Sequence, residues 1–294
     1  MKKHFTVSRR KLLGSGASVM MAAHAPLAAA EEPPYKLSIN IEIMFPRNMP
    51  RAQRMEAVAA HGMKAFSFWG ASEQEQQEMV RVQKRTGLVC ASIAGSGSIG
   101  RTTGLTKTGF EQAYLDVIRQ NCLVARRFGC ACMIVFAGQT QKEIPWDRQY
   151  AQIIGGLRKA GDIGRDYGVY VCLEPLNRVE SPEMTVLTAT EGFQIVHDVN
   201  HPNVKLCFDM YHLQLSEGNL TNNLKRGLEN NWIYLVQLGD VPGRKEPGTG
   251  EVNYGNILRV LRKSAYHGYL DTEYGTTSTP EYAMDVVRRL ASEN

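Results

Sequence analysis

Short apolar runs alternate with longer amphipathic stretches along most of the chain. From residue 35 onward, eight runs have the length and composition of β-strands: residues 37–43, 65–69, 89–93, 133–137, 169–173, 204–208, 233–238 and 269–273. In the stretches between and after them, apolar residues recur about every 3.6 positions. This spacing predicts helices over residues 52–61, 73–86, 110–128, 148–167, 191–199, 254–264 and 280–291.

The alternation of strands with helices predicts a parallel sheet covered by helices, because the runs are too apolar to have one face in water. Eight such units in a chain of 294 residues favour a closed (β/α)₈ barrel over an open, doubly wound sheet. The chain has neither a GxGxxG motif between a strand and a helix nor a GxxxxGK[ST] motif, so nucleotide binding is not indicated. A Gly-rich segment at residues 95–100 follows the third strand, where both a flexible lid and a plain linker fit the pattern.

The first thirty residues do not belong to this pattern. Residues 8–13 read Ser-Arg-Arg-Lys-Leu-Leu, a weakly apolar stretch follows, and Ala28-Ala29-Ala30 offers a small-residue cleavage site. These features predict a cleavable twin-arginine signal peptide over residues 1–30 and a single exported, periplasmic barrel domain over residues 31–294. No other stretch is apolar enough to span a bilayer, so we expect no membrane association after cleavage.

Removing the predicted signal peptide changes the charge of the chain. The whole sequence has 34 Lys and Arg against 29 Asp and Glu, but five of the basic residues and no acid lie in residues 1–30. The remaining chain is formally neutral, which gives no reason to expect a nucleic-acid partner. Its six cysteines form no CxxC pair, and buried free thiols are expected rather than disulfides or a metal site.

Polar residues close the last four predicted strands: Glu174, Asp209, Gln237 and Glu273. In a parallel barrel the carboxyl ends of the strands meet at one rim, where function collects. Three carboxylates and one amide give an all-oxygen ligand set, which suits Mg²⁺ or Mn²⁺ and also Co²⁺. Taken singly, each acid could be a helix N-cap or an ion-pair partner, and Gln237 an ordinary core amide. Their repetition on four successive strands favours a metal site.

Three motifs surround these strand ends. They read Glu-Pro-Leu-Asn at residues 174–177, Phe-Asp-Met-Tyr-His-Leu-Gln at 208–214, and Asp-x-Pro-Gly-Arg-x-Glu-Pro-Gly-Thr-Gly-Glu-x-Asn-Tyr at 240–254. Together they resemble the matching strand ends of the hydroxypyruvate isomerase family. The likeness is strong over residues 169–275 and general before that. It implies a xylose isomerase-like TIM barrel, in a superfamily that also includes ketose 3-epimerases and apurinic endonucleases.

The resemblance implies a role for each of the strand-end residues. One divalent metal ion would be held by four of them: Glu174, Asp209, Gln237 and Glu273. Glu174 and Glu273 would also be the catalytic acid and base, while His212 and Arg244 would bind substrate oxygens. The implied enzyme is an intramolecular oxidoreductase that moves a hydrogen between adjacent carbons of an α-hydroxycarbonyl compound through an enediolate. Such a reaction needs a base, an acid and an electrophile, which two carboxylates and a metal can supply.

The first four predicted strands depart from the hydroxypyruvate isomerases. Ser67 stands where that family has an acidic residue, and residues 91–94 replace a His-Asn pair. Trp69, at the end of the second strand, could form an apolar wall of the substrate pocket or be a core aromatic. The reaction class is therefore better indicated than the substrate, which we expect to be a small sugar, keto-sugar or hydroxy-keto acid.

Other functions remain as alternatives. A ketose 3-epimerase with the same metal site is the nearest, although those enzymes usually have His where this chain has Gln237. An apurinic-type endonuclease would need several His ligands, and of the seven histidines only His212 follows a predicted strand end closely. A sugar-binding barrel without turnover is the third alternative. The sequence leaves the oligomeric state open, and a homo-oligomer is compatible with it.

Overall fold

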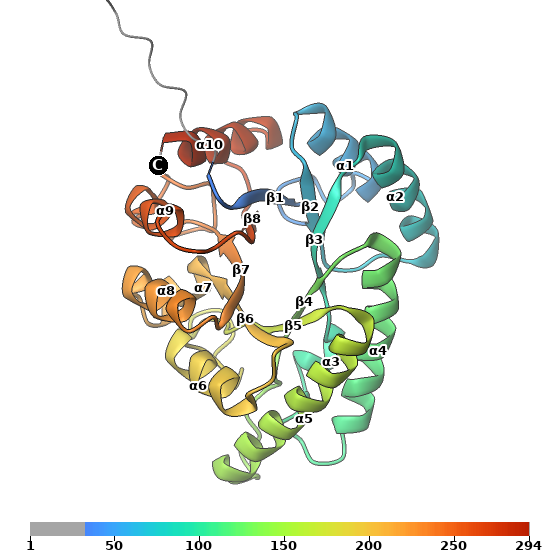
Figure 1. Cartoon of the computed structure of the whole chain (residues 1–294), viewed down its shortest axis with the longest axis vertical. Helices are drawn as coiled ribbons and strands as arrows, with labels where there is room; N and C mark the ends of the chain where they lie inside the picture. Colours follow the sequence, from blue (N-terminus) through green and yellow to red (C-terminus); the bar gives the residue numbers. More distant parts are fainter. Residues whose placement is uncertain (1–32, 294) are drawn as a thin grey trace, which may run out of the picture. The chain divides into compact units, whose positions relative to one another are not determined.

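Eight parallel strands close into a barrel in chain order (Figure 1). The computed structural model describes residues 33–293, so the predicted signal peptide lies outside the described residues. The strands are β1 (Lys36–Asn40), β2 (Ala65–Phe68), β3 (Val89–Ala94), β4 (Cys132–Val135), β5 (Tyr170–Leu173), β6 (Val204–Asp209), β7 (Ile233–Leu238) and β8 (Tyr269–Thr272). Pairing of β1 with β8 leaves the sheet without a free edge. The predicted closed barrel is confirmed, and each strand overlaps its predicted run.

Helices form a ring around the strands (Figure 1). They are α1 (Arg51–Ala60), α2 (Glu73–Thr86), α4 (Glu111–Phe128), α5 (Trp146–Tyr167), α6 (Ala189–Val199), α8 (Leu220–Glu229), α9 (Tyr254–Arg262) and α10 (Pro280–Glu293), with two short helices, α3 (Gly97–Gly100) and α7 (Met210–Ser216), following β3 and β6. The hydrophobic periodicity did not predict α3, α7 or α8. Helices α3 and α7 are only one or two turns long, too short to show a period. Helix α8 carries Asn and charged residues, which weaken its periodicity.

Local chemistry fixes where the longer helices begin and end. Ser72 caps α2 and Thr188 caps α6, each in a capping box with the acid three residues on. Helices α4 and α5 end at Gly129 and Gly168, which adopt the left-handed conformation that a Cβ would disfavour. These helix ends set the length of each βα unit and therefore the residue at which the next strand can begin.

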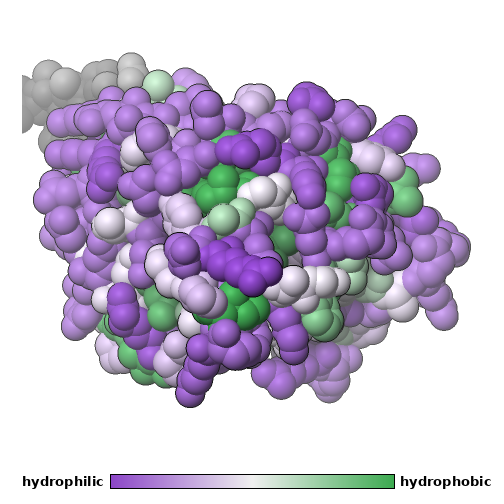
Figure 2. All heavy atoms as spheres, turned by 90° about the horizontal axis from the view of Figure 1, so that it is seen from below, coloured by the Kyte–Doolittle hydropathy of each residue, from purple (hydrophilic) through white to green (hydrophobic). Residues whose placement is uncertain are grey.

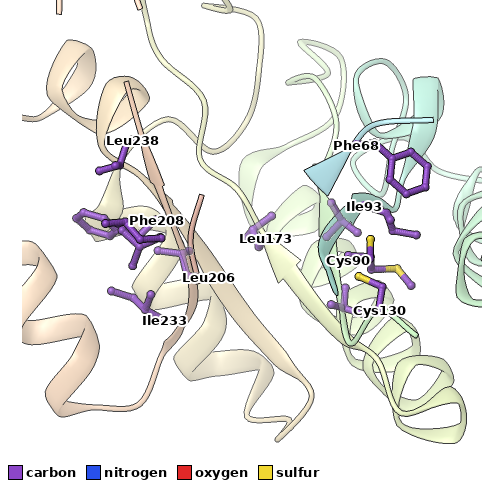
Figure 3. Packing of buried hydrophobic residues seen from close by; sticks show 14 of the residues in the cluster. Phe68, Cys90, Ile93, Cys130, Leu173, Leu206, Phe208, Ile233 and Leu238 are labelled. Carbon is purple, nitrogen blue, oxygen red and sulfur yellow. The ribbon is translucent and has the colours of Figure 1, made fainter. Parts of the chain in front are cut away.

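The main hydrophobic core lies between the sheet and the helices. Figure 3 shows buried side chains from β2, β3, β5, β6 and β7 that contribute to it. Phe68 packs edge-on against Phe128 of α4, and Phe208 stacks with Phe193 of α6. On the face shown in Figure 2, apolar patches are small and separated by hydrophilic residues. Among the described residues, no helix combines the length and apolar character that a bilayer crossing requires.

A second, smaller apolar cluster fills the inside of the barrel. It consists of Cys132, Ile134, Cys172, Cys207 and Leu235. The sulfur atoms of Cys132 and Cys172 lie 3.4 Å apart as thiols, and all six cysteines are free and buried. The expectation of buried free thiols is therefore confirmed.

Candidate active site

The carboxyl ends of β5 to β8 carry the four predicted ligands. Glu174 directly follows β5, Asp209 is the last residue of β6, Gln237 lies in β7, and Glu273 directly follows β8. In the sheet register Asp209 lies opposite Gln237, and Gln237 opposite Asp271. Each of the four predicted residues is at most 6% exposed. The register thus gathers three carboxylates and one amide at one buried end of the barrel.

Arg244 joins two of these carboxylates. Its Nη2 lies 2.6 Å from Oδ2 of Asp209 and 3.0 Å from Oε1 of Glu273, and its Nε donates to the backbone carbonyl of Glu273 at 2.9 Å. Arg244 has a φ of 51°, which is unusual for a residue other than glycine, and it follows Pro242 and Gly243. The guanidinium of Arg244 thus contacts two of the four predicted ligands, and its predicted contact with substrate stays a prediction.

The side chain of Asp209 contacts both the start of helix α7 and Arg244. Its Oδ1 accepts a hydrogen bond from the backbone N–H of Tyr211 at 2.8 Å, so it is the N-cap of α7. Its Oδ2 faces Arg244. The helix-cap role of Asp209 is therefore confirmed, and its second oxygen is still available for the predicted role as a metal ligand.

His212 lies beside the first two carboxylates. Its Nε2 is 3.6 Å from both Oε1 of Glu174 and Oδ2 of Asp209, and these three residues offer possible ligand atoms within 4.8 Å of one another. Its Nδ1 lies 2.7 Å from Nδ2 of Asn177. The amide of Asn177 is oriented because its Oδ1 accepts from the backbone N–H groups of Val179 and Glu180.

This orientation determines the tautomer of His212. Nδ2 of Asn177 donates to Nδ1, so the ring proton lies on Nε2, the nitrogen that faces Glu174 and Asp209. Burial lowers the pKa of His212 to about 4, so the ring is neutral. A neutral ring with a proton on Nε2 is a hydrogen-bond donor on the side of Glu174 and Asp209, and a nitrogen that carries a proton cannot at the same time bind a metal.

Gln237 is held by neighbours on both sides. Its Nε2 contacts Oε2 of Glu273 closely and lies 3.3 Å from Oδ2 of Asp271, while its Oε1 accepts from the thiol of Cys207 at 3.0 Å. The amide nitrogen rather than the oxygen therefore faces the carboxylates. A half-turn about the last torsion of the side chain would exchange the two atoms and present the oxygen as a ligand.

Asp271 is a buried acid that the sequence analysis missed. Ser67 of β2 donates to both of its oxygens at 2.9 and 2.8 Å. Burial raises the pKa of Asp271 to about 6, against hydrogen bonds that include the one from Ser67. Ser67, noted as a departure from the family pattern, is thus the donor that supports a carboxylate from β8. The sequence has two acids at this strand end, in Asp-Thr-Glu at residues 271–273, but the pattern of polar residues that close the strands indicated only Glu273.

The rim holds more negative charge than its one arginine neutralises. Burial raises the pKa of Glu174 well above its usual range, and the neighbouring charge of Glu273 raises it further. Burial also raises the pKa of Glu273 to about 7, although Arg244 opposes this shift. Clustered buried carboxylates of this kind need a cation, and oxygen donors favour a hard divalent ion. The residues present therefore fit the predicted metal.

A cavity of about 500 Å³ opens onto these acids. Glu174 and Glu273 line one part of it, and Trp69, Arg101 and Phe136 line another. Trp69 is 44% exposed, so it forms a wall of the cavity and is not a core aromatic. The sequence analysis did not single out Arg101 or Phe136. Their only signal was position, one just after the Gly-rich segment and the other just after β4.

The long motif at residues 240–254 folds around a single carboxylate. Asp240 accepts hydrogen bonds from the backbone N–H groups of Val241, Gly248, Gly250 and Val252. Glu246 accepts from the backbone of Thr277 beyond β8. The motif therefore builds a fixed loop that carries Arg244 to the rim.

Comparison with known proteins identifies the family. The family described as Xylose isomerase-like TIM barrel matches residues 55–292. The chain belongs to this family. Among similar members, the hydroxypyruvate isomerase of Escherichia coli K12 is 26% identical over 252 residues, which cover 85% of this chain and 96% of that protein. The 2-oxo-tetronate isomerase of Cupriavidus necator is 27% identical over 242 residues, 81% of this chain and 92% of that protein.

Solved structures of xylose isomerase-like barrels agree in fold. A protein described as AP endonuclease, family 2, from Brucella melitensis has a TM-score of 0.77 and 25% identity, covering 86% of this chain and 96% of that one. The 3-keto-D-glucoside 4-epimerase of E. coli has a TM-score of 0.73 and 20% identity, covering 87% and 98%. The predicted likeness to hydroxypyruvate isomerases is confirmed, and the relatives named here by sequence are isomerases, as the predicted enzyme class requires.

Proposed function

We propose that this protein is a divalent-metal-dependent isomerase of small α-hydroxycarbonyl compounds, of the hydroxypyruvate isomerase type. The observation that carries the proposal is the placement of two buried carboxylates, Glu174 and Glu273, on the same cavity, beside Asp209. The candidate substrates are hydroxy-keto acids, sugars and keto-sugars. Relatives named hydroxypyruvate isomerase and 2-oxo-tetronate isomerase support the reaction class.

The proposed chemistry divides the work among the rim residues. A divalent ion, Mg²⁺ or Mn²⁺ with Co²⁺ as a further option, held by Glu174, Asp209, Gln237 and Glu273, would stabilise the negative charge on the substrate oxygens. Of Glu174 and Glu273, one as the carboxylate removes the carbon-bound proton, and the other as the carboxylic acid donates a proton to the neighbouring carbon. The hydroxyl proton of the substrate passes to the former carbonyl oxygen, and the two side chains exchange their protonation states. The Nε2 proton of His212, which faces Glu174 and Asp209, would donate a hydrogen bond to a substrate oxygen bound beside these carboxylates.

A ketose 3-epimerase is the second candidate. It would share the proton removal, but the proton would return to the same carbon from the opposite face. Structures of similar fold include epimerases, such as the D-allulose 3-epimerase of Methylomonas sp. at 18% identity, and this shows the fold alone. Gln237, where those enzymes usually have His, favours the isomerase.

Hydrogen–deuterium exchange tests the proposal and separates the two candidates. The protein is treated with a chelator, reloaded with Mg²⁺ or Mn²⁺, and incubated in deuterated water with hydroxypyruvate, longer hydroxy-keto acids, aldoses and ketoses. We expect deuterium, located by NMR, only with metal present and, in the product, on the carbon that carried the carbonyl group in the substrate. Deuterium on a carbon whose configuration inverts would indicate the epimerase. A Glu111→Gln variant changes a glutamate in an exposed ion pair with Lys159, and it should give the same exchange as the unaltered protein.

Two results would contradict the proposal. If exchange persists after exhaustive removal of the metal, the reaction does not require the metal. Tight metal binding without exchange on any compound of the panel would favour a sugar-binding barrel without turnover.

A further inference from the structure

Two arginines line the cavity away from the acidic rim, and they differ in their partners. Arg51 is paired twice, through Nε with Glu42 at 2.8 Å and through Nη1 with Glu75 at 2.6 Å. Arg101 is exposed, and within residues 33–293 no carboxylate forms an ion pair with it. Its guanidinium carbon lies 4.2 Å from the centre of the Phe136 ring. The hydrogen-bonding edge of this guanidinium is therefore available to an anion in the cavity.

The segment that carries Arg101 is fixed to the next loop by backbone hydrogen bonds. The N–H of Leu105 donates to the carbonyl of Ala137 at 2.7 Å, and the N–H of Gln139 donates to the carbonyl of Thr102 at 2.8 Å. The side-chain amide of Gln139 also donates to the carbonyl of Arg101 itself at 3.0 Å. This segment is thus bonded to the loop that follows β4, and Arg101 within it lines the cavity.

Close backbone packing reinforces the same contact. Gly104 has a φ of 48°, and a Cβ on it would lie 2.2 Å from the carbonyl oxygen of Ala137. Ser96 accepts a hydrogen bond from the N–H of Phe136 at 3.0 Å, which ties the start of the segment to the residue that Arg101 covers. The backbone of Arg101 is therefore fixed beside the Phe136 ring before any ligand binds, which lowers part of the entropic cost of binding one.

The charges around the cavity are arranged in two regions. Glu174 and Glu273 make the rim acidic, so an anionic group of a ligand is repelled there unless metal is bound. Arg101 supplies positive charge on another wall.

We propose that Arg101, supported by Phe136, binds an anionic group of the substrate and makes this enzyme select acidic α-hydroxycarbonyl compounds over neutral sugars. The inference rests on the proposed function for the reaction, but the anion site stands on its own residues. A guanidinium edge binds a carboxylate or a phosphate with two parallel hydrogen bonds, so both are candidates. A cavity of about 500 Å³ has room for either on a short carbon chain.

Calorimetric binding to the Mn²⁺-loaded protein tests the anion site without turnover. The probes are glycerol, glycerate and glycerol 3-phosphate, which share a three-carbon chain and differ in the anionic group. We expect an Arg101→Gln substitution to weaken binding of one anionic probe by about 10- to 100-fold, as for a lost charge-assisted hydrogen-bonded pair. Arg101→Lys should recover part of this loss. The anionic probe that binds more tightly shows whether the site prefers a carboxylate or a phosphate.

The matched control is Arg126→Gln. Arg126 also lies over an aromatic ring, that of Tyr167 at 5.7 Å, but it does not line the cavity. We expect this variant to bind every probe as the unaltered protein does. Equal affinity of the unaltered protein for glycerol and for both anions, or equal losses for all probes in Arg101→Gln, would overturn the proposal.

Turnover separates this inference from the proposed function. In the exchange assay, the ratio of kcat/KM for an acidic substrate to that for a neutral sugar should fall at least about tenfold in Arg101→Gln. An unchanged ratio overturns the anion site while leaving the isomerase intact. If Arg101→Gln loses affinity for the anionic probes but the unaltered protein shows no exchange on any compound, the anion site is supported and the proposed isomerase activity is refuted.

Discussion

The two halves of the barrel rim place different chemistry on one cavity. The strands β5 to β8 end in acids and an amide, which are buried and joined to one another through Arg244 and His212. The strands β1 to β4 end in Asn40, Phe68, Ala94 and Val135, none of them ionisable, and the cations that line the cavity come from a helix and a loop. If the proposed roles hold, the reacting groups are fixed by strand register and the recognition groups are carried by loops and helix ends outside the strands.

The largest expected effect tests whether the acids of the two halves differ in function. Glu273→Gln keeps the shape of the side chain but removes the proton acceptor, so we expect the exchange rate to fall by about 10³-fold. Glu42→Gln, in the β1 half, changes an acid that pairs with Arg51 and Arg54, and activity should stay within a few-fold. The measurement is deuterium incorporation at saturating substrate, with far-UV circular dichroism to check folding. Similar losses in both variants would break the distinction.

The next effect concerns stability. Arg244→Gln leaves the buried carboxylates of Asp209 and Glu273 without their cation, so we expect the metal-free protein to lose about 3 kcal/mol of unfolding free energy. Mn²⁺ can compensate the same charges, so the metal should stabilise this variant more than the unaltered protein. Denaturant unfolding with and without Mn²⁺ measures both quantities.

Arg51→Gln is the control from the other half. Its partners Glu42 and Glu75 lie away from the acidic rim, and we expect a loss of about 1 kcal/mol or less that does not depend on metal. If the metal stabilises the Arg244 variant and the unaltered protein equally, the guanidinium and the metal do not share the same carboxylates.

The fold and the acidic half of the site could be predicted from the sequence because both depend on local order along the chain. Apolar runs of strand length gave the barrel, and a polar residue closing each of the last four runs gave the rim. Parallel register then brings such residues to one level without further information, as for Asp209 and Gln237.

The other half could not be predicted, since its features depend on side chains from distant segments. Arg101 gains its place from the ring of Phe136 and from hydrogen bonds to the following loop, and neither leaves a periodic signal. The Ser67–Asp271 pair joins β2 to β8, which become close through closure of the barrel. Arg244 was found through the family motif, but its bonds to Asp209 and Glu273 required the three-dimensional arrangement.

The smallest expected effect tests recognition alone. Trp69 lines the cavity from the β2 end and is 44% exposed, so Trp69→Ala should change stability little and raise KM by about tenfold, as for loss of an apolar contact with substrate. Trp146→Ala is the control, because Trp146 is 52% exposed and packs on Tyr150 away from the cavity. Steady-state kinetics on the substrate found by exchange gives both constants. A fall in kcat with KM unchanged would mean that Trp69 positions the reacting groups, and the division between the two halves would not hold at β2.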